Sequence, residues 1–564
     1  MHDFDPILLE VLWNRLISIV NEQATALMNA SFTTVVREAG DLSAGVFDTE
    51  GNMLAQAVTG TPGHINTMAT AVRHFLKAYP LETLHPGDSL ITNNPWLTSG
   101  HLHDLTVVTP IFYQEEPIGL FANTCHAMDI GGRTLGADAR EVYEEGLAIP
   151  IMKLYDRGKP NADLLAIIRE NVRVPEPVIG DIIAQVAGNE VGGQKLIEFM
   201  EEYKFTSLAP LSRAIIETSE AAMRAAIREI PDGTYRHQIM VDGFDDPIRI
   251  QIAITVQGDE MLIDYAGTSP QCDRGINVVF NYTHAYTTYP VKCAVSPHVP
   301  NNEGSFRPVK VTAPEGCILN AQRPAAVGAR HIIGHFLSCA VFGALSQVIP
   351  ERVIADGSAG LWNTQVHGED ENGKPFVYVF FSAGGMGARP TADGLSATAF
   401  PSGIHGVPAE IIENVSPLVM LCRELIQDSG GPGKFRGGCG QRMTLKVRSR
   451  KPIVHSCMYD RIKFPALGFC GGKEGRRGDL YLSDGTRPHP KKKYLLMPGQ
   501  EVTLELPGGG GFYPPTEREI ERVVEDVRNG LVSVAAAEQE YGVVLDPVTL
   551  TVDEEKTAQR RKKA

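Results

Sequence analysis

Two histidines and an aspartate in the first quarter of the sequence have the types and spacing of metal ligands. His101 and Asp104 share the motif His-Leu-His-Asp, and His126 lies further along the chain, directly after a cysteine. Two imidazoles and a carboxylate suit a divalent ion such as zinc, manganese or iron(II), and they leave coordination positions for water and substrate. A capped turn whose polar groups bond one another is the structural alternative, so the motif alone leaves both open.

The residues between these candidates are predicted to form a β-hairpin that brings them together. Residues 105–113 and 118–125 have β-like character and flank the turn sequence Gln-Glu-Glu-Pro. A hairpin that turns about the middle of the two glutamates places Leu105 opposite His126, with Asp104 beside it. Both histidines and the aspartate would then lie at the open end of one hairpin.

Three further side chains are candidates for the same site. Asp41 lies in a glycine-flanked bend, Gly-Asp-Leu-Ser-Ala-Gly, which could present a ligand or form an ordinary turn. His64 could line the pocket or flank the start of a helix. His103 would point away from Asp104 in an extended segment, which indicates a supporting role. The cysteine before His126 is not expected to act as a nucleophile with it, because neighbours on a strand point to opposite faces.

Two glycine clusters in the C-terminal half resemble phosphate loops but do not meet the requirements of one. The segment 428–435 contains Gly-Lys, yet it lacks the earlier glycine and the following hydroxyl residue of a P-loop. The segment 506–513 contains four consecutive glycines without the strand and helix of a dinucleotide fold. We therefore expect no nucleotide site in this chain, and we interpret the glycines as turns and close packing.

The elements around these motifs predict an α+β fold, a large interlocked mixed α/β body with a hairpin-borne metal site in its N-terminal part. Apolar periodicity predicts a helix from Pro6 to about Ala39. Further helices are predicted over about 65–78, over 163–171, over 177–200 with a glycine break, over 209–227, and over 516 to about 539. We predict three parts: a metal-site region over 1–230, a β-rich region over 231–515, and a charged helix with a polar tail over 516–564.

Composition and charge narrow the class of protein. The 564 residues include 52 Lys and Arg against 67 Asp and Glu, a net charge of −15, and 43% of them are hydrophobic. This composition excludes extensive disorder and argues against a nucleic-acid partner, which requires a basic surface. No apolar run is long enough to span a membrane and the N-terminus lacks a signal-peptide pattern, so a cytoplasmic location is predicted.

The chain resembles the hydantoinase B/oxoprolinase family from about residue 5 to 515. Besides His-Leu-His-Asp, the resemblance is carried by segments 38–43, 125–132, 145–150, 265–271, 300–304, 323–330, 429–438 and 507–511. So many motifs in one order make the resemblance specific. The family's metal pattern is His-x-x-Asp with a distal His and, in some members, an upstream Asp, which the resemblance places at His101, Asp104, His126 and Asp41.

This resemblance implies the hydrolytic subunit of an ATP-dependent cyclic amide hydrolase of the hydantoinase, oxoprolinase or lactamase type. A hydantoinase A-like partner would bind ATP and phosphorylate the small-molecule substrate, within an α2β2 heterotetramer. This chain would complete the reaction with a metal-bound water, and zinc is favoured over manganese or iron. Asp129 or His64 would assist proton transfer.

Two other functions stay open at the level of the sequence. The same family includes subunits of ATP-dependent ketone carboxylases, in which the metal would hold a bicarbonate-derived group or an enolate. A chain of this kind could also be a non-catalytic scaffold for an active partner.

Overall fold

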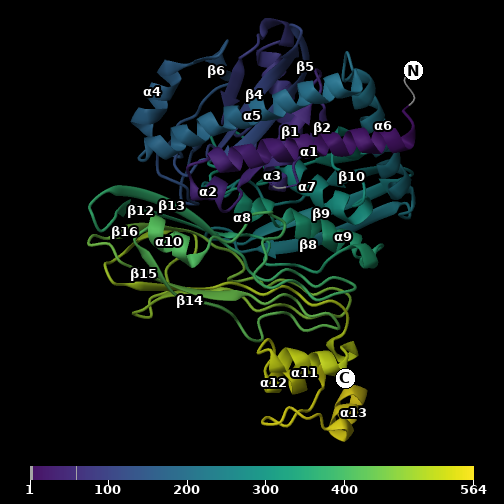
Figure 1. Cartoon of the computed structure of the whole chain (residues 1–564). Coiled ribbons are helices and arrows are strands. Elements are labelled where there is room, and N and C mark those ends of the chain that lie inside the picture. Colours follow the sequence, from purple (N-terminus) through teal and green to yellow (C-terminus); the bar gives the residue numbers. More distant parts are fainter. Residues whose placement is uncertain (1–3, 59, 564) are drawn as a thin grey trace.

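The computed structural model describes residues 4–58 and 60–563, which form four β-sheets with helices packed around them (Figure 1). Helices and antiparallel sheets are mixed along the chain, which confirms the predicted fold class. The largest cluster of buried side chains extends from Val35 to Phe512 and so includes residues on both sides of position 230. The three-part division of the chain stays a prediction.

The N-terminal sheet carries the predicted ligands and is covered by helices on both faces. Its strand order is β2-β1-β5-β4-β3-β6-β7. The strands are β1 (Leu42–Phe47), β2 (Met53–Gln56), β3 (Ser89–Thr92), β4 (Asp104–Tyr113), β5 (Glu116–His126), β6 (Met152–Asp156) and β7 (Lys159–Pro160). One face packs on α1 (Pro6–Ala30), α5 (Pro175–Tyr203) and α6 (Ala209–Arg228), and the other packs on α3 (Pro62–Ala78). Because both faces are covered, the polar ligand end of β4 and β5 is buried as well.

The hairpin β4–β5 exists as predicted, but its register differs by one residue. The turn residues are Gln114 and Glu115, both with positive φ, and a bulge at Ile118 shifts the pairing behind it. As a result Asp104, and not Leu105, pairs directly with His126. Facing partners share one side of a sheet, so this register brings the carboxylate and the imidazole closer than the predicted one.

The predicted first helix is wrong in its length, because a side chain from another helix ends it. α1 ends at Ala30, Ser31 is extended, and the short α2 (Thr34–Arg37) follows. Asp181 on α5 accepts hydrogen bonds from the backbone N–H of Phe32 at 2.6 Å and of Thr33 at 3.2 Å. These bonds satisfy backbone donors that a continuing helix would have used, so the helix stops there.

The glycine break predicted in the next long helix is absent, since α5 runs without interruption through the described residues 175–203. A Cβ at Gly192 would lie 2.5 Å from the Phe121 ring, and one at Gly193 would lie 2.4 Å from Ile111. These glycines therefore allow the helix to pack closely on β4 and β5 without breaking it.

Three smaller sheets and their helices make up most of the remaining chain (Figure 1). The second sheet has the order β11-β10-β9-β8, with β8 (Gly233–Val241), β9 (Ile248–Gln257), β10 (Glu260–Asp264) and β11 (Val309–Thr312). Next to it lie α7 (Phe280–Val295), α8 (His331–Gly334) and α9 (Leu337–Leu345). The third sheet contains β12 (Trp362–Glu369), β13 (Pro375–Ser382), β16 (Ile453–Met458) and β18 (Lys493–Leu496). The fourth contains β14 (Leu418–Leu425), β15 (Gln441–Val447), β17 (Asp479–Leu482) and β19 (Glu501–Glu505), with α10 (Ala409–Val415) beside β14.

The glycine clusters form one assembly of backbone segments, which we call the glycine bundle and define as residues 384–387, 430–440, 468–475 and 508–511. Most of the bundle is buried, but the stretch 470–474 is largely exposed. Its segments bond one another directly: Gly509 N–H donates to Gly438 at 3.0 Å, and Gly431 N–H donates to Gly509 at 2.7 Å. A Cβ at Gly508 would lie 1.7 Å from the Ser429 carbonyl oxygen. The bundle therefore requires glycine because backbones touch there, as the sequence predicted.

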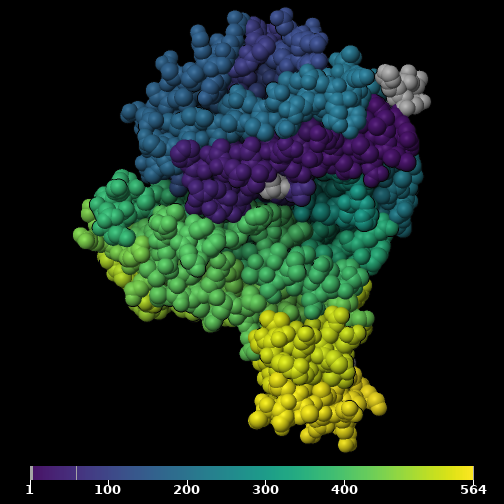
Figure 2. All heavy atoms as spheres, viewed as in Figure 1, coloured from purple at the N-terminus to yellow at the C-terminus, as the bar shows by residue number. Residues whose placement is uncertain are grey.

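The C-terminal residues form three helices that project from the body, as Figures 1 and 2 show. The single helix predicted there is wrong: α11 (Ile520–Arg528) and α12 (Val534–Tyr541) are separate, and α13 (Glu554–Lys563) follows. Gly530 has a φ of 72° between the first two, which interrupts the helical backbone. Among the described residues no helix is both long and apolar enough to cross a membrane.

Candidate metal centre

Three strands of the N-terminal sheet and the covering helix α3 bring the candidate residues together. Asp104 begins β4 and His126 ends β5, so their pairing fixes both side chains at one end of the hairpin. Asp41 immediately precedes β1, and its carbonyl accepts a hydrogen bond from the His126 N–H at 3.1 Å. His64 lies in the first turn of α3, which begins three residues earlier than the sequence predicted.

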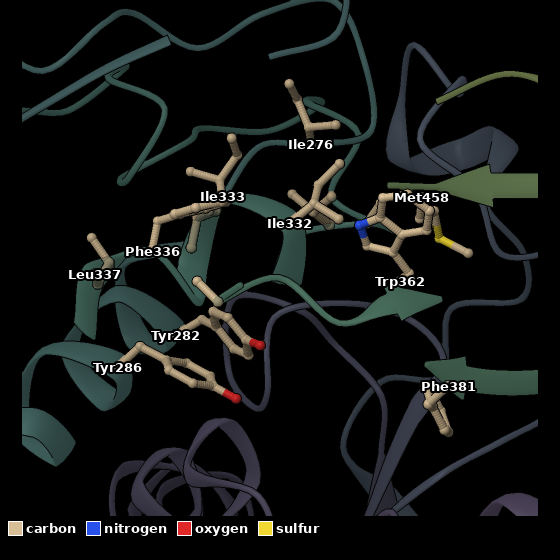
Figure 3. Packing of buried hydrophobic residues seen from close by; sticks show 14 of the residues in the cluster. Ile276, Tyr282, Tyr286, Ile332, Ile333, Phe336, Leu337, Trp362, Phe381 and Met458 are labelled. Atoms are coloured by element: carbon tan, nitrogen blue, oxygen red, sulfur yellow. The ribbon is translucent and has the colours of Figure 1, made fainter. Parts of the chain in front are cut away.

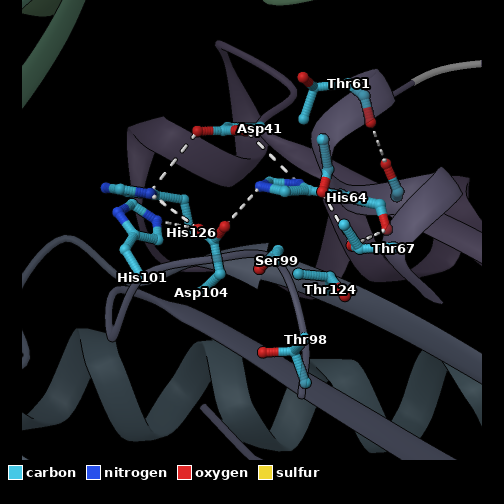
Figure 4. A network of polar contacts seen from close by, with 12 residues as sticks. Asp41, Thr61, His64, Thr67, Thr98, Ser99, His101, Asp104, Thr124 and His126 are labelled. Carbon is cyan, nitrogen blue, oxygen red and sulfur yellow. Dashed lines mark hydrogen bonds and ion pairs between the residues drawn. The ribbon is translucent and has the colours of Figure 1, made fainter. Parts of the chain in front are cut away.

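His101, Asp104 and His126 form a compact buried group whose candidate ligand atoms all lie within 4.8 Å of one another. His101 Nε2 lies 2.7 Å from Asp104 Oδ1, and His126 Nδ1 lies 3.1 Å from the same oxygen. Figure 4 shows these side chains pointing toward one another at the end of the hairpin. Such a group of two imidazoles and a carboxylate could hold a divalent metal ion.

Asp41 and His64 join this group from the other side of the hairpin end (Figure 4). His64 Nε2 lies 2.9 Å from Asp104 Oδ2, and its Nδ1 lies 3.7 Å from Asp41 Oδ1. Asp41 Oδ2 lies 3.8 Å from His126 Nδ1. The structure therefore places both candidates next to the buried triad, with Asp41 adjacent to His126 and His64 between the two carboxylates.

The donor set fits a metal ion because several of its buried atoms have no other partner. Within the described part of the chain, Asp41 Oδ1 and His126 Nε2 are buried without a hydrogen bond, and His101 Nε2 has only the Asp104 carboxylate beside it. Unsatisfied buried polar atoms are rare in folded proteins and point to a missing ion or water. His101 Nδ1 bonds the Gly328 carbonyl at 2.9 Å, an arrangement that leaves Nε2 as the ligand atom and orients the ring.

The electrostatics of the group favour an ionised carboxylate at Asp104 and a neutral imidazole at His101, whereas burial raises the pKa of Asp41. Burial, and to a smaller extent the charge of Arg330, lower the pKa of His101 to about 3. Burial alone would raise the pKa of Asp104, but His101, His64 and Arg330 together hold it well below its ordinary value. Burial opposes protonation of His64, yet the carboxylates of Asp104 and Asp41 raise its pKa. His64 can therefore carry a proton here.

The structure adds residues from distant segments that the spacing of the ligands did not indicate. Arg330 Nη2 lies 2.5 Å from Asp104 Oδ2, its Nε donates to the Ser99 carbonyl at 2.5 Å, and its guanidinium lies over the Tyr282 ring. Tyr282 in turn packs within the buried cluster shown in Figure 3. His331 and His335 also line the site. Arg330 is the last residue of segment 323–330, one of the segments that carry the family resemblance. That resemblance was the one signal in the sequence that pointed to Arg330.

Two other predicted residues, His103 and Asp129, have surroundings that differ from those predicted. His103 is buried in a turn, not an extended segment, so its ring stacks on His126 with the centroids 5.6 Å apart and does not point away. Asp129 Oδ1 accepts hydrogen bonds from the Gly131 N–H at 3.1 Å and from Arg173 Nη1 at 2.9 Å. Its carboxylate is thus engaged by Arg173, and it is not among the described residues that line the metal centre.

The space at the metal centre is very small. A cavity of about 30 Å³ is lined by Asp41, His64, His101, His126 and residues from α8 and β13. This volume admits an ion with a water but not a ring-shaped organic molecule. A substrate must therefore reach the centre from an adjoining space.

Comparisons with known proteins match this chain over most of its length to one family and to several characterised relatives. The sequence profile of the hydantoinase B/oxoprolinase family matches residues 5–515. One subunit of a putative D-/L-hydantoinase from Pseudomonas sp. strain NS671 is 32% identical over 99% of this chain and 98% of its own length. The crystal structure of an ATP-dependent caprolactamase from Pseudomonas jessenii has a TM-score of 0.90, 28% identity and full coverage of both chains. A 5-oxoprolinase from Saccharomyces cerevisiae is 28% identical over 90% of this chain, which matches 42% of that longer protein.

Proposed function

The chain belongs to the hydantoinase B/oxoprolinase family, and from this premise we propose that it is the hydrolytic subunit of an ATP-dependent cyclic amide hydrolase. The buried group of His101, Asp104 and His126 carries the proposal, because these three side chains could hold a metal ion in a chain of this family. Asp41 is the proposed fourth ligand. Zinc is the metal we favour, since the mixed nitrogen and oxygen donors suit it.

A divalent ion held by these residues would act as a Lewis acid and make a water molecule nucleophilic near neutral pH. Arg330 and the His101–Gly328 hydrogen bond hold two of the ligands in position for it. His64 contacts Asp104 from outside the triad, so we propose that it, and not Asp129, moves the proton during hydrolysis. The engagement of Asp129 by Arg173 supports this assignment.

A separate partner would supply the ATP-dependent step. The sequence contains no P-loop or dinucleotide motif. The hydantoinase relative is one component of its enzyme, and the longer 5-oxoprolinase matches over less than half of its own length. We propose that a hydantoinase A-like partner phosphorylates the amide oxygen of the substrate, which makes the ring carbon susceptible to attack by water. An α2β2 assembly is our prediction for the complex.

The test is turnover by the complex of this chain with its partner, with ATP and with hydantoin, 5-oxoproline or caprolactam as substrates. We expect purified wild-type protein to contain a stoichiometric metal ion, and His101→Ala to lose both the metal and at least about a hundredfold of the activity. His74→Ala, a half-buried histidine on the same helix as His64, is the matched control and should keep both. Metal-free active protein, or a fully active His101→Ala variant, would refute the proposal.

One further arm separates hydrolysis from carboxylation. Labelled bicarbonate is added to the same reaction, and hydrolysis requires that no label enters the product. Turnover by the partner alone would instead indicate that this chain is a scaffold.

A further inference from the structure

A larger cavity of about 480 Å³ adjoins the metal centre, and the two share part of their walls. Ser402 lines both spaces. Thr61, which lies beside His64 in Figure 4, lines the metal centre, while its neighbours Gly60 and Pro62 line the larger cavity. Ligand pockets typically have volumes of about 300–1,000 Å³. The larger cavity can therefore hold a small ring-shaped substrate directly next to the ion site.

One buried lysine gives this cavity its chemical character. Lys292 on α7 lines the cavity and is 9% exposed, and its Nζ is buried with no hydrogen-bond partner in the described part of the chain. Among the described residues that line the cavity it is the one charged side chain, and no carboxylate is present to neutralise it. A buried ammonium without a partner is costly, so its position points to an anionic ligand.

Two other features of the same walls favour an anion. Ser402 Oγ is buried and has no hydrogen-bond partner among the described residues. The 17-residue helix α3 starts at Pro62 on the cavity wall without a side-chain cap from Thr61, whose backbone carbonyl accepts the N–H groups of His64 and Ile65. A helix N-terminus carries a partial positive charge and attracts phosphate groups. Apolar side chains such as Ile65 and Val299 complete the lining and suit a ring.

We propose that this cavity receives the phosphorylated substrate, and that Lys292 binds its phosphoryl group while the ring lies toward the metal centre across Ser402. The proposal rests on the proposed function, because it assumes a substrate phosphorylated by the partner. The same site would hold the inorganic phosphate that hydrolysis leaves behind. The ligand chemistry is a phosphoryl dianion in both cases.

The protonation of Lys292 agrees with this role. Burial lowers the pKa of its ammonium to about 8, so most of it remains charged near neutral pH. Its titratable neighbours on α7, Tyr289 and Cys293, have pKa values raised by burial, that of Cys293 to about 11, and they stay neutral. The facing wall segments from α3, 299–301 and 401–403 contribute no titratable side chain to the lining.

The decisive experiment uses calorimetry to measure binding of inorganic phosphate to the full chain in wild type and three variants. Wild type and His101→Ala should bind phosphate alike, because the site does not require the metal. Lys292→Met should bind at least about tenfold more weakly, whereas Lys310→Met, an exposed lysine, should bind like wild type. Phosphate binding that depends on His101 and not on Lys292 would place the anion on the metal and overturn the proposal.

Two further measurements keep the result interpretable. Sulfate stays a dianion from pH 7 to 9.5, so its affinity for wild-type protein should fall about tenfold per pH unit above the pKa of Lys292. A flat profile, or acetate that competes as well as phosphate, would refute a phosphoryl site formed by this lysine.

If His101→Ala loses turnover while phosphate binding persists, both proposals stand. If it stays active while Lys292→Met loses phosphate, the hydrolase proposal fails and the anion site remains.

Discussion

Distant segments of the chain meet both at the metal centre and in the glycine bundle, but the two regions are built in opposite ways. At the metal centre, five side chains converge and each supplies a charge or a donor atom. In the glycine bundle, backbones converge because side chains are missing, and carbonyls and N–H groups of different segments bond one another. The first arrangement serves chemistry and the second serves close packing. Removing a side chain should therefore damage one region, and adding a methyl group should damage the other.

The strongest test of this contrast is to add one methyl group to the glycine bundle. In Gly508→Ala the new Cβ would lie 1.7 Å from the Ser429 carbonyl oxygen, so backbone must move. We expect a loss of about 3 kcal/mol or more in the free energy of unfolding, at the upper end for overpacking. Urea denaturation monitored by circular dichroism measures it.

The matched control for this change is Gly360→Ala, where the nearest atoms to a new Cβ lie at 3.8 and 3.9 Å. That variant should unfold within about 0.5 kcal/mol of wild type. His101→Ala should also keep its fold while it loses metal. Equal stability of the Gly508→Ala and Gly360→Ala variants would show that the bundle adapts and that the contrast drawn above is wrong.

A smaller effect is expected from a residue that supports the metal centre without binding the ion. Arg330→Met removes the contact to Asp104 and the hydrogen bond to the Ser99 carbonyl, so the carboxylate loses its orientation. We expect the metal affinity, measured by competition with a chelator, to fall about 10- to 100-fold. Arg330→Lys keeps the charge but cannot reach both Asp104 and the Ser99 carbonyl. Its metal affinity should therefore lie between those of wild type and Arg330→Met. Unchanged affinity in Arg330→Met would mean that the ligands position themselves.

The smallest effect, measured per pH unit, concerns Glu145, a side chain that holds backbone in place near the metal centre. It accepts hydrogen bonds from the N–H groups of Val327 at 2.8 Å and Gly328 at 2.6 Å, and burial raises its pKa to about 8. The folded protein therefore binds a proton that the unfolded chain releases above its ordinary pKa. Stability from this group is fully present below that value and is lost as pH rises through about 8.

We expect Glu145→Gln to flatten this dependence of the unfolding free energy on pH, which has a slope of at most about 1.4 kcal/mol per pH unit for one group. Thermal or urea unfolding between pH 5 and 8 measures the slope. Glu141→Gln, an exposed neighbour, is the control and should keep the wild-type slope. A slope that survives in Glu145→Gln would assign the titration to another group.

Short-range patterns in the sequence were sufficient to predict part of the metal centre and part of the glycine bundle. The spacing of His101, Asp104 and His126 predicted a shared site because a hairpin brings its two ends together, and the structure groups these residues. The glycine clusters predicted close packing, because repeated loss of the side chain has few other uses in a buried segment. The continuous helix α5 and the true end of α1 were not predictable, since Phe121 and Asp181 determine them from other elements.

The sequence by itself thus determined which residue types could bind a metal, and it showed that no nucleotide motif accompanies them. Only the tertiary structure decided which atoms meet. The bulge at Ile118 set the register that pairs Asp104 with His126, and the fold brought Arg330 to that carboxylate from far along the chain. Lys292 became notable only because its ammonium is buried without a hydrogen-bond partner among the described residues. The physical reason is that spacing encodes local geometry, whereas burial and charge pairing depend on segments that meet only when the whole chain is packed.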